Sequence, residues 1–375
     1  MKRRIGIDVG GTNTDAVYLE DTRVVHAVKT PTTRDVTSGV TDALRKLLQA
    51  GAPKTVDAVM IGTTHFTNAV VQRRDLTRVA AIRIGLPSGA SLPPFIDWSE
   101  DLAALVRGEV VMLEGGHEFD GRPLVPLDTA GVRAAARRIR AAGLMSVGVA
   151  SVFSPLNAAC ELEAAAILRE ECPDVAVTLS HQLGRIGLLE RENAALLNAA
   201  LVGLARTTTR AFTDALAASG ITAPLYLTQN DGAVMLASVA EAFPVYGFAS
   251  GPTNSMRGAA FLSKLTDALV IDVGGTTTDI GSLRHGFPRE ANNVVEIGGV
   301  RTLFRMPDLL SIGLGGGSLV ARAPLTVGPR SVGYRLVEEG LVFGGGALTA
   351  PTSQWPRASS ISATDGVSRR CRPSS

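Results

Sequence analysis

Two glycine-rich segments, each headed by an aspartate, carry residue types that can hold a phosphate group. Residues 7–15 read IDVGGTNTD and residues 271–279 read IDVGGTTTD, so they differ at one position in nine, at a constant offset of 264 residues. Phosphate oxygens need several converging N–H donors, and glycines let backbone amides turn inward without a Cβ in the way. A carboxylate at the end of a strand can hold a hydrated Mg²⁺ that bridges phosphate oxygens.

The repeat therefore predicts two phosphate hairpins that face each other and contact one nucleotide from both sides. A single Gly-Gly-Thr turn could be no more than a tight hairpin, but its duplication favours phosphate binding. We expect Asp8 and Asp272 to be catalytic and to organise Mg²⁺. The other candidate phosphate ligands are the glycine, threonine and asparagine residues of the two turns, namely Gly10, Gly11, Thr12, Asn13, Thr14, Gly274, Gly275, Thr276, Thr277 and Thr278.

Two other nucleotide motifs do not fit the sequence. A Walker loop needs a Gly-Lys dipeptide, which the chain lacks, and a dinucleotide fingerprint needs its glycine turn to open a helix, whereas strand-forming residues follow here. A third glycine cluster lies at residues 313–318, where glycines would permit close approach of an adenine or ribose. Its candidate adenosine ligands are Gly313, Gly315, Gly316 and Gly317. A nearby cluster at residues 344–346 leaves a purely structural reading open.

Weaker candidates lie outside the glycine motifs. Asp231 follows a predicted strand, where α/β folds place ligand-binding loops, so it is our candidate general base. The Asn-Asp-Gly sequence around it is also a strong turn former, which is the alternative. His65 could contact substrate or serve packing, and structural roles are favoured for His117 and His181 because neither has partners at metal-ligand spacing.

The elements that must position these residues follow from hydrophobic periodicity. Strands are expected near residues 5–9, 16–19, 23–28 and 56–61, with an amphipathic helix over 36–48. Three antiparallel strands, a helix and a further strand form a ribonuclease-H-like layout with helices on a mixed sheet. Further strands are expected near residues 79–84, 110–113, 147–150 and 175–178, with helices over 129–142 (N-cap Asp128) and 158–171.

The repeat of the hairpin motif implies that the second half forms a related domain. A long helix is expected over residues 188–216, a strand over 225–228 and a helix over 250–262. Strands near residues 294–297 and 301–305 follow the second hairpin. The last 25 residues are rich in serine, arginine and proline without periodicity, which predicts a disordered tail.

Composition excludes several function classes. The formal charge of +2 and short basic runs predict no nucleic-acid partner, and no apolar run is long enough to span a bilayer, so no membrane partner is expected. Three cysteines without CxxC spacing fit neither a disulfide scaffold nor an iron–sulfur activator ATPase of this fold. These features, with the lack of a secretory leader, predict a cytoplasmic protein.

The order of the motifs resembles the phosphate 1, connect, phosphate 2 and adenosine segments of actin-like ATPases, which include Hsp70 and sugar kinases. More closely, the chain resembles the hydantoinase A/5-oxoprolinase family over roughly residues 4–349. The residues that carry this lie at positions 8–15, 62–68, 250–252, 272–279 and 312–317. The resemblance implies an α/β fold with two ribonuclease-H-like domains and mixed sheets around an interdomain ATP cleft.

The family resemblance also implies an activity. It is ATP-dependent opening of a cyclic amide, such as a hydantoin or 5-oxoproline, in which the amide oxygen is phosphorylated and water hydrolyses the C–N bond. ATP and Mg²⁺ are the implied cofactors, a small cyclic amide is the substrate, and a second hydantoinase-type subunit is the partner. Thr63 and Thr64, at the domain crossing, would add catalytic contacts to the γ-phosphate or substrate. A small-molecule kinase and a non-catalytic ATP-binding regulatory protein remain alternatives.

The chain departs from the family pattern near its end. Family members are longer and continue with an ordered helical segment after residue 349, whereas the unpatterned tail begins here, which predicts a C-terminal truncation or frameshift. We therefore expect an N-terminal hydantoinase/oxoprolinase-type domain over residues 1–180, a second actin-like ATPase domain over 181–349 and the tail over 350–375. Activity of such a chain is in question, because the adenosine side of the cleft would be incomplete.

Overall fold

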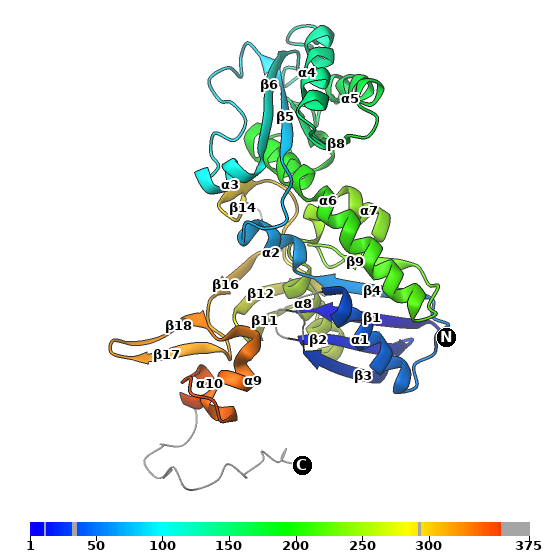
Figure 1. Cartoon of the computed structure of the whole chain (residues 1–375), viewed down its shortest axis with the longest axis vertical. Coiled ribbons are helices and arrows are strands. Elements are labelled where there is room, and N and C mark those ends of the chain that lie inside the picture. The colour runs from blue at the N-terminus through cyan, green and yellow to red at the C-terminus, as the bar shows by residue number, and fades with distance from the viewer. Residues whose placement is uncertain (11–12, 32–35, 292–293, 354–375) are drawn as a thin grey trace.

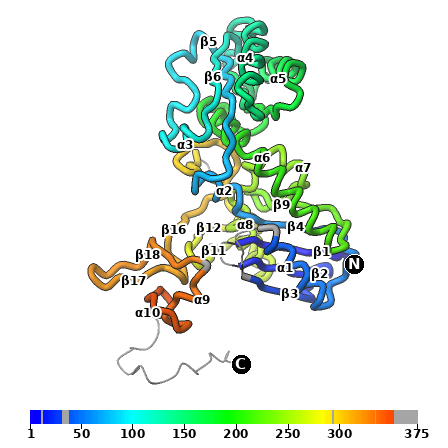
Figure 2. Tube along the Cα trace, in the orientation of Figure 1, coloured from blue at the N-terminus to red at the C-terminus, as the bar shows by residue number. Residues whose placement is uncertain are grey.

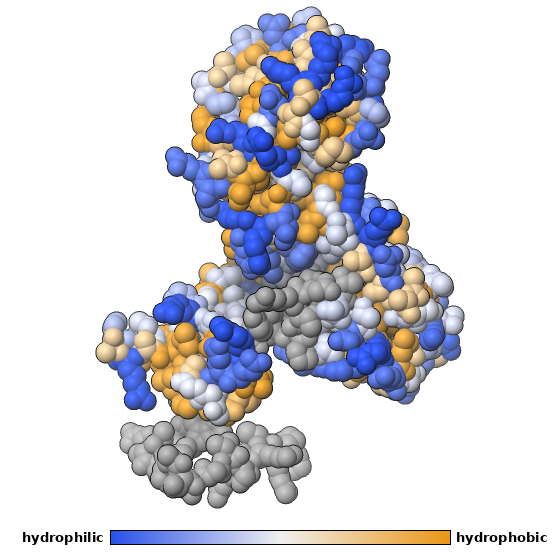
Figure 3. Space-filling view, in the orientation of Figure 1, coloured by the Kyte–Doolittle hydropathy of each residue, from blue (hydrophilic) through white to orange (hydrophobic). Residues whose placement is uncertain are grey.

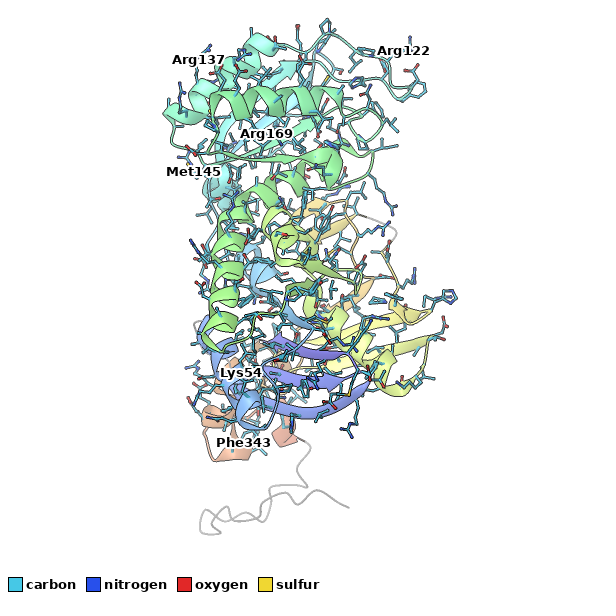
Figure 4. All side chains as sticks on the ribbon, turned by 90° about the vertical axis from the view of Figure 1, so that its right-hand side faces the viewer. Lys54, Arg122, Arg137, Met145, Arg169 and Phe343 are labelled. Carbon is cyan, nitrogen blue, oxygen red and sulfur yellow. The ribbon has the colours of Figure 1, made fainter. Side chains whose placement is uncertain are left out.

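The computed structural model of the chain describes residues 1–10, 13–31, 36–291 and 294–353. Figure 1 shows an elongated molecule in which residues 79–179 form a lobe at one end, while the described residues of 3–63, 268–288 and 309–353 lie toward the other, and residues 295–302 lie between them. Figure 2 follows the chain between the two ends. In Figure 4, Arg122, Arg137 and Arg169 belong to the first lobe, and Lys54 and Phe343 lie near the opposite end.

A six-stranded mixed sheet carries the first hairpin. Its strand order is β10-β9-β4-β1-β2-β3. Strand β1 pairs antiparallel with β2 and parallel with β4, and β4 pairs parallel with β9. The strands are β1 (Arg3–Val9), β2 (Asn13–Glu20), β3 (Arg23–Pro31), β4 (Ala58–Thr63), β9 (Leu225–Thr228) and β10 (Val234–Leu236). This confirms the predicted three antiparallel strands followed by a fourth.

Helix α1 (Val36–Gln49) covers one face of this sheet, close to the predicted bounds. Alternate residues of β1 point to that face, as the period of two in a strand requires. Ile5, Ile7 and Val9 are at most 5% exposed. The helix contributes four fully buried side chains at helical spacing, Val40, Ala43, Leu44 and Leu47.

The lobe of residues 79–179 contains an entirely parallel sheet of order β6-β5-β7-β8. Its strands are β5 (Val79–Leu86), β6 (Arg107–Glu114), β7 (Ser146–Ser151) and β8 (Ala176–Leu179). Helices α4 (Thr129–Ala141) and α5 (Ala159–Glu171) pack with it in one apolar core. The predicted cap is confirmed, because the Asp128 carboxylate accepts a hydrogen bond from the Gly131 amide at 2.8 Å.

One long helix joins the two ends of the molecule (Figure 1). It is α6 (Leu188–Ala218), which packs against β7 and β8 at its start and against α1 and α7 further along. The remaining helices of this region are α2 (His65–Val71), α3 (Glu100–Val106), α7 (Ala237–Ala242) and α8 (Ser250–Ser263), with 3₁₀ turns η1 (Ser180–Gln182) and η2 (Pro244–Gly247). Helices α3 and α7 were not predicted, because seven residues or fewer are too short for periodicity to reveal.

The second hairpin lies in a smaller antiparallel sheet of β11 (Ala268–Val273), β12 (Thr278–Arg284), β13 (Phe287–Pro288) and β16 (Leu309–Ile312). Two more hairpins follow it, β14 (Val295–Ile297) with β15 (Val300–Thr302) and β17 (Ser318–Arg322) with β18 (Leu325–Ser331). The short elements η3 (Gly333–Arg335), α9 (Leu336–Glu339), η4 (Leu341–Phe343) and α10 (Ala350–Ser353) complete the described chain. Figure 3 shows apolar surface at the lower left, where Figure 1 labels α9 and α10.

The fold class is α/β with mixed sheets, as predicted. The predicted unit of residues 1–180 holds strands of two separate sheets, and the sheet of β1–β4 also takes in β9 and β10 from the second predicted unit. The boundary at residues 180 and 181 stays a prediction. Of the predicted tail, residues 350–353 form α10 and residues 354–375 lie outside the described chain.

The length and hydropathy of the helices show whether any described helix could span a membrane. Within the described ranges, no helix is at once long enough and apolar enough to cross a bilayer.

Candidate functional site

The two glycine hairpins close with the same backbone hydrogen bond. The Gly10 amide donates to the Asn13 carbonyl at 3.0 Å, and the Gly274 amide donates to the Thr277 carbonyl at 2.8 Å. A Cβ on either glycine would lie only 3.1–3.2 Å from the accepting carbonyl oxygen. The sequence repeat is therefore a repeat of local structure.

Each hairpin carries two carboxylates directly opposite each other. Asp8 pairs with Asp15 across the β1–β2 ladder, and Asp272 pairs with Asp279 across the β11–β12 ladder. Burial raises the pKa of the Asp279 carboxyl, and the charge of Asp272 raises it further, while a hydrogen bond with Ser311 lowers it. Negative charge is thus concentrated beside both turns.

Asp8 is the most perturbed of these groups. Burial raises the pKa of Asp8 to about 6, a hydrogen bond from Asn254 opposes the shift, and the charges of Asp15 and Asp272 add to it. Because Asp272 belongs to the other hairpin, its effect on Asp8 indicates that the two hairpins lie within electrostatic range of each other. Figure 1 shows both hairpins in the same part of the molecule, with α8 labelled close to them.

Helix α8 brings a polar group to Asp8 that sequence reasoning missed. The Asn254 side-chain amide donates to the Asp8 carboxylate at 3.3 Å. This approach requires a glycine at position 62 on β4, because a Cβ there would lie 1.9 Å from Nδ2 of Asn254 and 2.8 Å from Oδ1 of Asp8. The one available signal in the helix sequence was the place of Asn254 one turn after Ser250.

The same helix contacts the second sheet through another glycine. Met256 packs with Ala260 and Leu283 in a small apolar cluster. A Cβ on Gly281 of β12 would lie 2.8 Å from Sδ of Met256. Helix α8 is therefore in direct contact with the strands of both hairpins.

The start of α8 is fixed to the end of β4, next to the predicted Thr63 and Thr64. The Ser250 hydroxyl donates to the Thr63 carbonyl at 2.7 Å, and the Thr63 amide donates back to Ser250 Oγ at 3.3 Å. The Thr63 hydroxyl accepts from the His65 amide at 3.2 Å, and the Thr64 hydroxyl accepts from the Asn68 side chain at 3.1 Å. In the ladder register Thr63 lies opposite Val9, so both threonines lie beside the first hairpin.

The glycine loop of residues 313–318 lies directly against the second hairpin. The Gly316 amide donates to the Gly274 carbonyl at 2.9 Å, and the Gly317 amide donates to the Gly275 carbonyl at 2.6 Å. A Cβ on Gly315 would lie 2.6–2.7 Å from the hairpin backbone. These glycines thus serve close backbone approach, and two of their amides already have protein acceptors, while their adenosine role stays a prediction.

The threonines of the turns divide into two kinds. Thr14 and Thr278 occupy equivalent positions and are 0% and 6% exposed. The Thr278 hydroxyl donates to the Leu314 carbonyl at 2.6 Å, so it ties the glycine loop to the hairpin. Thr276 and Thr277, in contrast, are exposed at the tip.

The tip of the first hairpin cannot be compared with Thr276 and Thr277 of the second. Gly11 and Thr12 lie outside the described residues, so their predicted contacts stay predictions.

A cavity of about 450 Å³ lies beside Asp231. We call it the Asp231 pocket. Three stretches and one further residue line it, namely residues 182–185, 229–231 and 303–305, and Tyr246. The Asp231 carboxylate accepts a hydrogen bond from the Ala233 amide at 2.9 Å, which holds the side chain in its turn. Burial raises the pKa of Tyr246, and the positive charge of Arg305 lowers it, which places a phenol and a guanidinium in the same pocket.

Asn230 connects this pocket to α8. Its side chain donates to the Val245 carbonyl at 3.0 Å and accepts from the Ala249 amide at 2.8 Å. Its carbonyl accepts from the Thr253 hydroxyl at 3.1 Å. Since Asn254 follows Thr253, one short stretch of α8 touches both the pocket and Asp8.

The structure places the three histidines of the sequence analysis in different surroundings. His181 lies in a buried polar network, where its Nδ1 is 2.7 Å from the Glu161 carboxylate. His117 is 3% exposed and packs inside the parallel-sheet lobe. His65 starts α2, and burial lowers its pKa.

The carboxylate oxygens at the hairpins suit a hard cation such as Mg²⁺, which needs few ligands from the protein. Among the described residues, no three histidine, cysteine, aspartate or glutamate side chains converge at metal-binding distance. A magnesium ion commonly uses one or two carboxylates and completes its shell with water and substrate phosphates. Asp8 is half-buried, two other carboxylates act on it and its pKa is raised, so it is the described group whose charge a cation would compensate best.

Comparison of the sequence with known families gives two matches that together span most of the chain. Residues 4–172 match the hydantoinase/oxoprolinase N-terminal region, and residues 191–350 match hydantoinase/oxoprolinase. Among curated proteins, the chain is 27% identical over 368 residues to the acetophenone carboxylase gamma subunit of Aromatoleum aromaticum, covering 88% of the chain and 49% of that protein. It is 25% identical over 369 residues to caprolactamase subunit alpha of Pseudomonas jessenii, covering 88% and 51%.

Solved structures show the same fold. The chain superposes on the ATP-dependent caprolactamase from Pseudomonas jessenii with a TM-score of 0.73 at 23% identity, covering 92% of the chain and 53% of that protein. Nucleotide-free acetone carboxylase gives a TM-score of 0.69 at 20% identity, covering 92% and 54%. The chain thus spans about half the length of the relatives it matches.

Proposed function

Because the chain belongs to the hydantoinase/oxoprolinase family, we propose that it is the nucleotide-binding part of an ATP-dependent enzyme that opens a cyclic amide. The observation that carries this proposal is the pair of matching hairpins, with the carboxylates of Asp8 and Asp272 in electrostatic range across a shared helix. The names of two relatives, an ATP-dependent caprolactamase and a carboxylase subunit, support ATP use and a carbonyl substrate.

The hairpins would hold the phosphates. The exposed hydroxyls of Thr276 and Thr277, with the backbone amides of the same tip, are the donors best presented to a ligand in the second hairpin. Asp8 and Asp272 would hold the Mg²⁺ of the nucleotide, and Asn254 would fix the orientation of the Asp8 carboxylate. When bound, Mg·ATP supplies the phosphoryl group that activates the carbonyl oxygen.

Activation of the amide is chemically necessary for an unstrained ring. An amide carbonyl is a poor electrophile, and phosphorylation of its oxygen would make the carbon open to attack by water. The tetrahedral adduct would then expel the ring nitrogen, which takes up a proton, and this breaks the C–N bond. A second water would hydrolyse the remaining acyl phosphate to a carboxylate and inorganic phosphate. The Asp231 pocket, at about 450 Å³, has room for a small ring and is joined to the hairpins through Asn230 and α8. Asp231 would accept the proton of the attacking water, held in place by the Ala233 amide.

We propose the identity of the ring first as a chemical class and then as particular compounds. A lactam is supported by the caprolactamase relative, and a hydantoin or 5-oxoproline is the more specific possibility that the family description suggests. The relatives named as subunits support a partner polypeptide, which we include in the proposal.

A ketone substrate is the second candidate, because one relative is an acetophenone carboxylase subunit and one solved structure is acetone carboxylase. A ketone also offers a carbonyl oxygen for phosphorylation, through its enol form. Product analysis separates the candidates. Opening of a lactam or 5-oxoproline yields an amino acid, and opening of a hydantoin yields an N-carbamoyl amino acid. Ketone carboxylation yields a β-keto acid, and a simple kinase leaves a stable phosphorylated product.

The first test is calorimetric titration with Mg·ATP. We expect binding that Asp8→Ala and Asp272→Ala each weaken at least about 100-fold, equivalent to about 2.7 kcal/mol. Asp120→Ala, on the distant lobe, is the control and should bind normally. Normal binding by both hairpin variants would disprove the paired phosphate site.

The second test is ATP hydrolysis with a panel of lactams, hydantoins, 5-oxoproline and ketones, in the presence of candidate partner subunits. Stimulation by a cyclic amide that Asp231→Asn reduces about 100-fold supports the general-base role. Tight ATP binding with no stimulation by any of these compounds would favour a regulatory ATP-binding protein.

A further inference from the structure

The charged residues that line the Asp231 pocket are unequal in sign. Among the lining residues, Arg185, Asp231 and Arg305 carry a charge at neutral pH. Burial raises the pKa of the Tyr246 phenol, which therefore keeps its proton there. Two arginines and one aspartate leave the cavity with one positive charge in excess. A cavity with excess positive charge favours an anionic ligand over a neutral one.

The two arginines come from stretches of chain that lie against each other. A Cβ on Gly184 would lie only 3.0 Å from the Leu303 carbonyl oxygen. Arg185 follows Gly184 directly, and Arg305 lies two residues after Leu303. Asp231 comes from a separate stretch, in the turn after β9. The two positive charges and the carboxylate therefore belong to different segments of the pocket lining.

The stretch that carries Arg185 is fixed at both ends. Arg191 of α6 is fully buried and donates to the Arg185 and Ile186 carbonyls at 3.0 and 2.8 Å. At the other end, the Tyr246 hydroxyl donates to the Gln182 carbonyl at 2.7 Å. These bonds restrict the backbone before any ligand binds, which lowers the entropic cost of binding at this part of the pocket.

Neither arginine is firmly paired with a carboxylate in the described part of the chain. Arg305 lies 3.8 Å from Glu290, and the two side chains are 69% and 41% exposed. An exposed ion pair of that length contributes little. Among the residues that the structure describes, Arg185 has no carboxylate within the 4.0 Å of an ion pair. Both positive charges can therefore serve a ligand.

The apolar part of the lining suits a small ring. Leu183 and Phe304 come from the same two stretches as the arginines and are 3% and 9% exposed. The cavity of about 450 Å³ lies within the range of roughly 300–1,000 Å³ that is typical of small-molecule sites, which join apolar walls to a few polar groups. The pocket thus combines apolar contact for a ring with positive charge for an anionic substituent.

We propose that the ring substrate carries a carboxylate and that Arg185 and Arg305 bind it as the specificity-determining residues of the Asp231 pocket. The proposal rests on the proposed function, because it takes this pocket as the site of the ring. Guanidinium groups bind carboxylates through charge-assisted, often bidentate hydrogen bonds, which an uncharged substituent does not replace. The two arginines select anionic rings over uncharged lactams, and Asp231, on its separate stretch, stays available as the base.

Binding of matched acids and amides tests this directly. 5-Oxoproline and its six-membered ring homologue are each compared with the corresponding carboxamide, which keeps the ring and removes the charge. Ligand-observed NMR titrations of the whole chain are run at constant ionic strength, with and without Mg·ATP. We expect both acids to bind at least about tenfold more tightly than their carboxamides.

Substitutions of the arginines identify the groups responsible. Arg185→Gln and Arg305→Gln should each lower the affinity for the acids about tenfold and leave the affinity for the carboxamides unchanged. Arg137→Gln is the matched control, because it removes the same charge from an exposed position on α4 of the distant lobe (Figure 4). All three positions lie on the surface, and thermal melting by circular dichroism checks that the variants fold.

Equal binding of acid and carboxamide would overturn the proposal, as would a preference that both pocket variants retain, or no binding of either acid. Inorganic phosphate is titrated as a further probe. Tighter binding of phosphate than of the acids, lost in both pocket variants, would assign the positive charge to a phosphoryl group and contradict the carboxylate assignment. Failure of the nucleotide site gives a different result, namely no Mg·ATP binding with the preference for acids unchanged.

Discussion

At the scale of single residues, the candidate site requires glycine at position 62. Gly62 leaves the space in which the Asn254 amide reaches the Asp8 carboxylate. A substituent at that position would collide with both partners, and the carboxylate would lose the donor that favours its charged form. The first hairpin is thus coupled to α8 through one glycine.

Gly62→Ala should therefore impair both stability and nucleotide binding. We expect a loss of about 1–3 kcal/mol in the free energy of unfolding, because the new Cβ would lie 1.9 Å from Asn254. Gly258→Ala in the same helix is the control, since a Cβ there meets nothing within 4 Å, and it should stabilise by about 0.5–1 kcal/mol. Urea unfolding checks both variants, and a neutral Gly62→Ala would contradict the close contact.

The raised pKa of Asp8 predicts how stability depends on pH. The folded protein binds the Asp8 proton up to about pH 6, whereas an unfolded aspartate releases it near 3.8. Between these values the folded state binds more protons, so this group makes stability fall as pH rises, by up to about 3 kcal/mol once pH exceeds 6.

Asp8→Asn should remove that dependence. The variant should gain stability relative to the wild type as pH rises from 4 to 7, measured by urea unfolding without nucleotide. A difference between the two proteins that does not change with pH would refute the raised pKa. Because Mg²⁺ needs the ionised carboxylate, Mg·ATP affinity of the wild type should also fall as pH decreases below about 6.

At the scale of elements, two buried polar contacts hold helices in place. Asn230 fixes η2 and the start of α8, with hydrogen bonds to Val245, Ala249 and Thr253. Further up the molecule, the 0%-exposed Arg83 of β5 pairs with Glu192 of α6 and also donates to a loop carbonyl.

Asn230→Ala should loosen α8 and the Asp231 pocket together. Losing the side-chain bonds at a 3%-exposed position should cost about 2–4 kcal/mol. It should also weaken Mg·ATP binding through Asn254. Gln229→Ala, the neighbouring position, should stay within about 0.5 kcal/mol of wild type. Urea unfolding and calorimetry measure these effects, and unchanged nucleotide affinity in Asn230→Ala would show that the two regions are independent.

The Arg83–Glu192 pair should behave as a unit. Either Arg83→Met or Glu192→Leu alone should cost about 3–5 kcal/mol, because it leaves an uncompensated buried charge. The double variant should be less destabilised than the sum of the two. A double-mutant cycle by urea unfolding tests this, and simple additivity would contradict the coupling.

At the scale of the whole molecule, nucleotide should stabilise one end far more than the other. The two hairpins lie at the end opposite the β5–β8 lobe (Figure 1). At 100 times its dissociation constant, Mg·ATP should add about 2.7 kcal/mol to global stability. Amide hydrogen exchange should slow in β1, β11 and α8 and change little in α4 and α5, and equal slowing in both regions would contradict this placement.

The sequence predicted the hairpins and much of the fold, because these depend on local patterns. The repeat at Asp8 and Asp272 reports a turn that each segment forms by itself, and the apolar period of residues 36–48 marks a helix without its neighbours. Asn254 and the Asp231 pocket could not be predicted in this way. The pocket combines residues 182–185, 229–231 and 303–305, which only the folded chain brings together.

The position of α8 has a mechanical consequence. On one side the helix meets Gly62 of β4 and on the other it meets Gly281 of β12, and the contacting residues Asn254 and Met256 are two apart, about 3 Å along the helix axis. Because glycine has no side chain, neither position can adjust by a rotamer change if the spacing between α8 and the strands changes. The width of the gap between the hairpins is therefore set by the diameter of one helix, so any opening must break one of these contacts or shift the helix along its own axis.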